Sequence, residues 1–132
     1  MRAIVAGTRY FDDYRYLNEV LRYVFLTLQG EGYNINREVM EIVTNRDKGV
    51  AGLARLFSDV NRLELKIMYS GDAPSHLAHY VRNENMINYA LEDPQIGVLV
   101  ALHDEVSTIT ADLINQARMR GMRMFIFNPN KR

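Results

Sequence analysis

Residues 1–9 read Met-Arg-Ala-Ile-Val-Ala-Gly-Thr-Arg, an apolar run that stops at Gly7 and is followed by a hydroxyl, Thr8, and a cation, Arg9. This pattern predicts a buried strand that opens into a turn suited to an anion, with phosphate as the natural candidate. Gly7 would leave room for a ligand beside the backbone, and helix-forming residues from about Asp13 would place amide groups nearby. The alternative is that Gly7 only ends the strand and Arg9 is a solvated charge. This alternative stays open because a Gly-Thr-Arg turn is far less specific than a full nucleotide-binding fingerprint.

Apolar runs of strand length recur along the chain and are separated by longer stretches of helical periodicity. They lie at Ala3–Ala6, Val39–Val43, Leu63–Met68, Ile96–Leu102 and Met122–Phe127. This alternation is typical of a parallel sheet covered by helices. We therefore expect an α/β fold: one Rossmann-like three-layer domain over residues 1–132, with a mainly parallel five-stranded sheet.

The spacing of apolar residues in the first and last helical stretches predicts which face of each helix lies on the sheet. The first stretch repeats at Tyr16, Val20, Tyr23, Val24 and Leu28, and the last at Ile109, Leu113, Ala117 and Arg120. Asp12 or Asp13 is expected to cap the first helix, and Gly121 to adopt a left-handed turn after the last.

Composition limits the chemistry that the chain can perform. It has no cysteine, which excludes disulfides, thiolate metal ligands and a cysteine nucleophile. His76 and His79 have a spacing that binds metal on a helix, but no third ligand accompanies them, so we expect neither a metal nor another cofactor.

Sixteen basic residues balance sixteen acidic ones, which makes nucleic acid an unexpected partner. No apolar run approaches the ~20 residues of a membrane span and no signal peptide is recognisable, so we expect a soluble cytoplasmic protein without a membrane partner.

Ligands of open parallel sheets bind beyond the carboxyl ends of the strands, where the chain order reverses. Four polar loops follow predicted strands and are candidates for this site: Gly7–Asp12, Thr44–Gly49, Ser70–Asn83 and His103–Thr110.

The second and third loops supply cations. Arg46 and Lys48, beside Asn45, precede a predicted helix whose amide dipole would add to their attraction for an anion. Arg82 and Asn83 open the next predicted helix, where Arg82 would pair with phosphate and Asn83 would contact a sugar or a base edge. The alternatives are a solvated charge cluster and a capping Asn.

The fourth loop carries His103, Asp104, Ser107 and Thr110. Hydroxyl groups at a helix start suit either phosphate and ribose or the capping of the helix. His103 and Asp104 suggest acid–base chemistry, but adjacent residues at a strand end point to opposite faces and need not act together.

These motifs, in this order, resemble the SLOG superfamily of Smf/DprA and LOG proteins, and most closely its short YspA-like members, many of them uncharacterised bacterial and phage proteins. The Gly-Thr-Arg of residues 7–9 matches a family Gly-Ser/Thr-Arg turn, and the Phe-Asp of residues 11–12 matches the pair that follows it. Residues 82–86, Arg-Asn-Glu-Asn-Met, match the family motif Arg-Asn-x-x-Met.

Two other family motifs are degraded. The second loop of the family reads Ser-Gly-Gly-Ala-Arg-Gly-Ala-Asp, and here Asn45 and Arg46 replace its first two glycines. The fourth, Asp-Gly-x-Ser-x-Gly-Thr, has Glu105 and Ile109 in place of its glycines. The glutamate-bearing signature of LOG phosphoribohydrolases is absent from the sequence, so hydrolysis of an N-glycosidic bond is not expected.

The resemblance and the surviving cations together favour non-catalytic binding of a nucleotide-like small molecule. The chain would act as a sensor or a sequestering protein, in the host cytoplasm if it is encoded by a phage. The expected ligand-binding residues are Gly7, Thr8, Arg9, Asn45, Arg46, Lys48, Arg82, Asn83, His103, Ser107 and Thr110.

Two other functions remain open at this stage. The first is an enzyme that acts on a nucleotide or nucleoside phosphate, with His103, Asp104 or Glu105 as acid or base. The second is a structural or DNA-associated protein, because Smf/DprA relatives bind single-stranded DNA. It would require a basic face built from Arg118, Arg120, Arg123, Lys131 and Arg132.

A homo-oligomer is also expected. It follows from the SLOG resemblance and from aromatic residues in and around the first helix that exceed what one face need bury. These residues are Tyr10, Tyr14, Phe25 and Tyr33.

Overall fold

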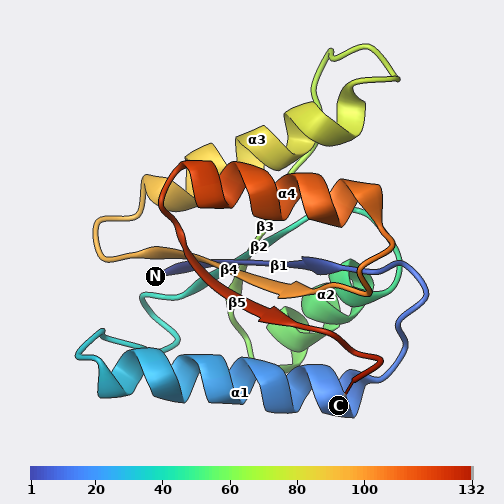
Figure 1. Cartoon of the computed structure of the whole chain (residues 1–132). Helices are drawn as coiled ribbons and strands as arrows, with labels where there is room; N and C mark the ends of the chain where they lie inside the picture. Colours follow the sequence, from blue (N-terminus) through green and yellow to red (C-terminus); the bar gives the residue numbers. More distant parts are fainter. Residues whose placement is uncertain (132) are drawn as a thin grey trace.

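The computed structural model describes residues 1–131, in which five parallel strands form one sheet between two layers of helices (Figure 1). The elements in chain order are β1 (Arg2–Gly7), α1 (Tyr14–Gly30), β2 (Glu41–Thr44), α2 (Val50–Val60), β3 (Glu64–Ile67), α3 (Ala78–Leu91), β4 (Gly97–Leu102), α4 (Thr108–Met119) and β5 (Arg123–Phe127). The expected α/β fold with Rossmann-like layers is confirmed, and all strand pairs in the described residues are parallel.

The strand order is β3-β2-β1-β4-β5, with β1 at the centre of the sheet. Arg2 is in register with Glu41 of β2 on one side and with Gly97 of β4 on the other. The chain therefore builds outward from β1 in one direction and then returns to build in the other. The order reverses between β1 and β4, which is where open sheets of this kind leave a crevice.

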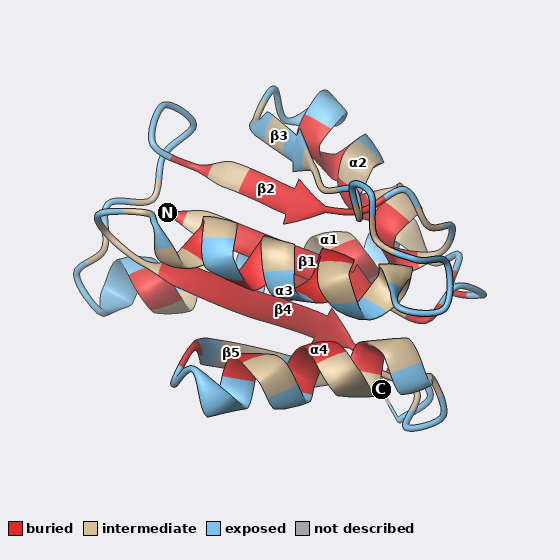
Figure 2. Ribbon diagram, turned by 90° about the horizontal axis from the view of Figure 1, so that it is seen from above, coloured by how far each residue is buried: buried red, intermediate tan, exposed pale blue. Residues whose placement is uncertain are grey.

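Burial explains why these segments form strands. All six residues of β4 are buried, whereas β3 at the edge alternates between exposed and half-buried residues. Val98, Val100 and Leu102 pack on the face covered by α1 and α2. Leu99 and Ala101 pack on the opposite face under α3 and α4. Figure 2 shows the buried central strands between partly exposed helices, as expected for a parallel sheet covered on both faces.

The helix ends and faces match the sequence prediction in part. Asp13, not Asp12, caps α1 by accepting from the Tyr16 amide at 3.1 Å. Tyr23, which we expected on the sheet, is 58% exposed. The placement of Arg120 on the sheet-facing side is wrong, because α4 ends before it and its exposed side chain donates to Asn88 at 2.6 Å.

The aromatic residues around α1 differ in how far they are buried. Tyr14, Phe25 and Tyr33 are partly buried and pack against the core, whereas Tyr10 is 95% exposed. The excess of surface aromatics that motivated the oligomer prediction is therefore smaller than the sequence suggests. Within residues 1–131, none of the helices combines the length and the apolar composition needed to cross a bilayer.

Candidate functional site

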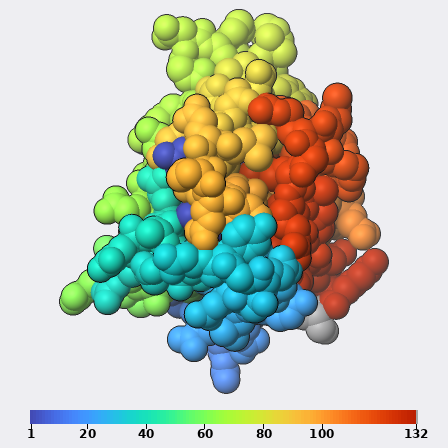
Figure 3. All heavy atoms as spheres, turned by 90° about the vertical axis from the view of Figure 1, so that its left-hand side faces the viewer, coloured from blue at the N-terminus to red at the C-terminus, as the bar shows by residue number. Residues whose placement is uncertain are grey.

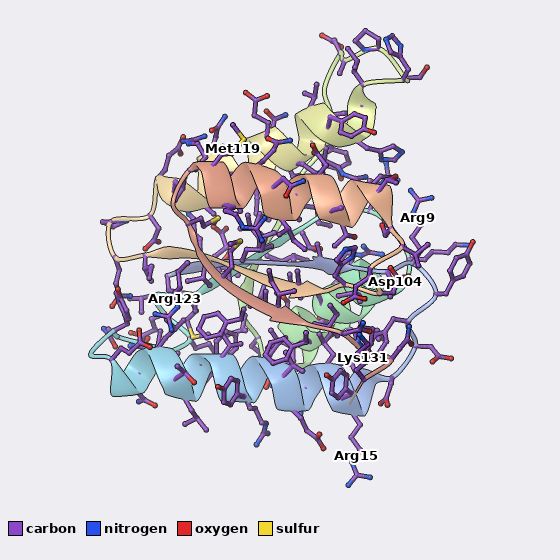
Figure 4. All side chains as sticks on the ribbon, viewed as in Figure 1. Arg9, Arg15, Asp104, Met119, Arg123 and Lys131 are labelled. Atoms are coloured by element: carbon purple, nitrogen blue, oxygen red, sulfur yellow. The ribbon has the colours of Figure 1, made fainter. Side chains whose placement is uncertain are left out.

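The loops that follow β1, β2, β3 and β4 meet at the carboxyl edge of the sheet, on the right of Figure 1. Arg9 of the first loop and Asp104 of the fourth both lie at this edge (Figure 4). The parallel sheet therefore brings the expected loops together, and their side chains determine what the edge binds.

Two glycines let the backbones at this edge touch. A Cβ at Gly7 would overlap the carbonyl oxygen of Leu102, and a Cβ at Gly49, where φ is +70°, would overlap that of Thr8. The amide of Val50, the first residue of α2, donates to the Thr8 carbonyl at 3.2 Å. We expected Gly7 to leave room for a ligand, but it is required for the packing of β1 against β4. The first amide of α2 already has a hydrogen-bond acceptor within the chain and is not free for a ligand.

The centre of the site is a carboxylate held between two arginines. Asp47 accepts two hydrogen bonds from Arg82, at 3.3 and 3.0 Å, and one from Arg9 at 3.3 Å. The side chains of Arg82 and Asp47 are 10% and 17% exposed, whereas that of Arg9 is 51% exposed. Arg9 and Arg82 therefore converge as expected, but an internal anion occupies the position between them.

The loop that carries Asp47 is held in place by hydrogen bonds. The Asn45 side chain accepts from the Asp47 amide at 2.8 Å. Arg55 of α2 donates to the carbonyl oxygens of Asn45 and Asp47 at 2.6 and 3.0 Å. Asn45 is 4% exposed, so it shapes the loop and is not accessible to a large ligand.

A hollow of about 330 Å³ adjoins this ion pair. Its lining residues are Arg46, Met68, Tyr69, Ser70, Gly71 and Arg82. The Arg46 guanidinium lies 5.4 Å from the centre of the Tyr69 ring, and Tyr69 is 54% exposed. The Nε atom of Arg82 is buried and has no hydrogen-bond partner within the described residues, although its terminal nitrogens hold Asp47. The hollow therefore offers two guanidinium groups and an aromatic ring.

Asn83 faces away from this hollow. We expected Arg82 and Asn83 at the start of a helix. The helix α3 begins at Ala78, however, so both residues lie in its second turn. Asn83 is 1% exposed and donates to the Ile109 carbonyl at 3.0 Å and to Asp112 at 3.1 Å. Successive helix residues point about 100° apart, which explains why Arg82 reaches the site while Asn83 joins α3 to α4.

Asp104 organises the fourth loop. Its carboxylate accepts from the amides of Val106 and Ser107, each at 2.9 Å, and from the Thr8 hydroxyl. These bonds hold the pKa of the Asp104 carboxyl below its usual value, with the Ser107 amide as the largest cause. The Nδ1 atom of His103 is 3.9 Å from Asp104 and has no hydrogen-bond partner in the described chain, so the two residues do not form a hydrogen-bonded dyad.

The hydroxyl groups of this loop cap the helix. Ser107 accepts from the Thr110 amide at 3.3 Å, and its hydroxyl donates to the Thr110 hydroxyl at 3.2 Å. A second hollow of about 300 Å³ lies beside Asp104 and is lined also by Asp12 and Tyr10. Two carboxylates line this second hollow, so it suits an anion poorly. The first hollow, lined by Arg46 and Arg82, suits a phosphate better.

The remaining candidate residues lie outside these hollows. Lys48 is exposed, and within residues 1–131 no ion pair involves it. In the basic face that a DNA-associated protein would require, Arg123 pairs with Glu31 at 2.7 Å and Lys131 with Glu105 at 3.7 Å. The last member of that face, residue 132, lies outside the described residues. Among the described residues, no three His, Asp or Glu side chains gather as metal ligands would.

Sequence reasoning missed Asp47, Tyr69 and Arg55. Asp47 carried a recognisable signal, since Asn-x-Asp is typical of a turn closed by the Asn side chain, and it lies between two cations in the sequence. Tyr69 and Arg55 gave no comparable local signal.

Comparison with known proteins adds no assignment. No family model matches the chain, and neither a curated protein nor a solved structure matches it significantly. The SLOG resemblance therefore stays a prediction.

Proposed function

We propose that the chain binds a phosphate-bearing, nucleotide-derived ligand in the hollow between Arg46, Tyr69 and Arg82, and that it does not turn this ligand over. The observation that carries the proposal is that Arg82 lines this hollow and that its guanidinium keeps one donor, the buried Nε–H, without a partner within the described residues. A buried donor without an acceptor is costly, and a phosphate oxygen would satisfy it with a charge-assisted bond.

The rest of the hollow fits the two chemical parts of a nucleotide. Arg46 adds a second guanidinium for the phosphate, and the exposed ring of Tyr69 offers a face on which a base stacks. Asp47 already holds the terminal nitrogens of Arg82, so the free donor is the Nε–H. This atom is shielded from solvent, and a ligand would reach it through a small shift of the Arg82 side chain.

Binding without turnover is favoured by the lining of this hollow. Among the described residues, those that line it include no carboxylate and no imidazole, the groups that most often transfer protons in enzymes. An enzyme is the second candidate, because Asp12 and Asp104 line the neighbouring hollow. The lowered pKa of Asp104 suits an ionised base, or a carboxylate that accepts a hydrogen bond from a ligand hydroxyl, and not a proton donor at neutral pH.

The experiment is native mass spectrometry of the purified protein for any bound nucleotide, followed by calorimetry with AMP and ADP. Arg46→Ala is the first variant, because Arg46 is exposed and its loss should not affect folding. Arg82→Ala is expected to weaken binding by about 1.5–3 kcal/mol, the contribution of a hydrogen bond to a charged group. Arg118→Ala, an exposed arginine on α4, is the matched control. Equal affinities in all four proteins, or no binding of either nucleotide, would refute the proposal.

A further inference from the structure

A groove lies at the amino edge of the sheet, at the end of the molecule opposite the candidate ligand site. Two hollows of about 520 and 340 Å³ form it and share Arg22, Phe25 and Met40. Met40 directly precedes β2, and Leu63, which also lines the groove, directly precedes β3. Figure 3 looks onto this edge, where residues 31–40 (cyan) cross the lower part of the surface. The groove is therefore independent of the proposed ligand site.

The floor of the groove is apolar. The rings of Phe25 and Phe57 are tilted against each other with their centres 6.1 Å apart, and Met40 is 6% exposed. Leu26 and Val60 line the same hollows and are 67% and 62% exposed. Exposed aliphatic side chains beside an aromatic floor suit the apolar side chains of a partner.

Three arginines, Arg22, Arg37 and Arg62, also line the groove. None of them has an ion pair or a hydrogen bond from its side chain within residues 1–131, whereas five other arginines each contact a carboxylate. The described residues that line the two hollows include no Asp or Glu. In a chain with no formal net charge, the groove is therefore a local concentration of unpaired positive charge.

The backbone at Arg62 is strained. Arg62 follows the end of α2 with φ at +55°, the left-handed region. Its amide donates to the Asp59 carbonyl at 3.3 Å, and the next amide, of Leu63, donates to the Ser58 carbonyl at 2.9 Å. These two bonds form a Schellman helix end, in which glycine is favoured because a Cβ is crowded in the left-handed conformation.

The same chain uses glycine at two equivalent positions. Gly32 after α1 and Gly121 after α4 have φ of +100° and +67° and the same pair of closing hydrogen bonds. Among these three equivalent turns in the described residues, arginine stands only at the one that borders the groove. Arg62 therefore strains the backbone while its side chain has no partner within the described residues, which leaves its guanidinium available to another molecule.

We propose that this groove docks a partner protein through an acidic segment in which apolar side chains alternate with Asp or Glu. The carboxylates would pair with the guanidinium groups of Arg22, Arg37 and Arg62, and the apolar side chains would pack on the aromatic floor. A second copy of this chain fits less well, because a two-fold contact through this groove would bring the same arginines face to face. A bilayer surface fits less well, because it is flat and the groove is concave.

The test is fluorescence anisotropy with a short fluorescein-labelled peptide of alternating Asp-Leu and Glu-Phe pairs. Its matched control peptide carries Asn and Gln in place of Asp and Glu. Arg62→Gly is the decisive variant, because glycine should keep or raise the melting temperature while weakening binding of the acidic peptide about tenfold. Arg22→Ala should weaken binding similarly, whereas Arg15→Ala, at an exposed position on the same helix, should not.

The proposal is supported if the acidic peptide binds, the neutral peptide binds more weakly, and both groove variants lose affinity while Arg15→Ala does not. It is overturned if Arg62→Gly folds and binds the acidic peptide as the parent does. It is also overturned if the peptide fails to bind while Arg22→Ala abolishes self-association in light scattering, which would make a second copy the occupant. Arginine-dependent binding to vesicles of phosphatidylserine and phosphatidylcholine, without peptide binding, would overturn it in favour of a lipid surface.

Discussion

Replacing Asp47 by Asn is expected to lower stability and raise affinity for an anion at the same time. The Asp47 carboxylate accepts two bonds from Arg82 and one from Arg9, and the Arg82 side chain is only 10% exposed. Asn keeps one oxygen acceptor but removes the negative charge. A hydrogen bond to a charged group contributes about 1.5–3 kcal/mol and an exposed ion pair under about 1 kcal/mol. Because Asp47 is partly exposed, we expect a loss of about 1–3 kcal/mol in the free energy of unfolding.

The same substitution removes a repulsion from the ligand site. A phosphate on Arg82 would share its guanidinium group with the Asp47 carboxylate. For two unit charges about 6 Å apart, at an effective dielectric constant of about 20–40, the repulsion is about 1.4–2.8 kcal/mol. Relief of this repulsion should tighten phosphate binding by about tenfold or more.

The assay measures both quantities on the same proteins, with urea denaturation for stability and calorimetry for ADP affinity. Asp59→Asn is the control, because it removes the same charge at an exposed position that forms no ion pair within the described residues. The reasoning would be refuted if Asp47→Asn bound ADP as weakly as the control, or more weakly than the parent protein. That result would mean either that Asp47 contacts the ligand directly or that the anion binds elsewhere.

Three further predictions concern the backbone, the pH dependence of stability and catalysis. Gly49→Ala should destabilise the protein by about 2–4 kcal/mol, because it combines a positive φ with overlap against backbone atoms, whereas Gly121→Ala has a similar φ with open space and should cost about 1 kcal/mol in urea denaturation. The Asp104→Asn variant should be less stable than the parent at neutral pH, because the pKa of Asp104 is lowered in the folded state. The Asp104 carboxylate stabilises the fold at pH values above its unfolded-state pKa of about 3.9, and this stabilisation is lost as the pH falls through the folded-state pKa. A stability difference that stays constant from neutral pH into acid would contradict this assignment. Incubation with AMP, ADP and cyclic AMP should give no free base or phosphate by chromatography. Release that Asp12→Asn abolishes would instead support an enzyme whose site is the hollow between Asp12 and Asp104.

The sequence determined the layered architecture because hydrophobic periodicity is a local property. Five apolar runs of strand length, separated by stretches of helical spacing, were sufficient to predict a parallel sheet with helices on both faces. The same reasoning placed four loops at one edge, since the carboxyl ends of parallel strands coincide. Gly121 was also predictable, because the left-handed turn after a helix favours glycine through its own backbone sterics.

Only the tertiary structure decided what each polar side chain contacts. Arg82 and Asn83 are neighbours in the sequence, yet one reaches Asp47 and the other joins α3 to α4, because the start of α3 fixes their directions around the helix axis. The pairing of Asp47 with Arg82 spans 35 residues, and no local pattern encodes it. The arginines of the amino-edge groove, which form no ion pair within the described residues, could not be recognised in the sequence for the same reason. Charge and periodicity are read along the chain, whereas a binding site depends on which distant side chains the fold leaves without a partner.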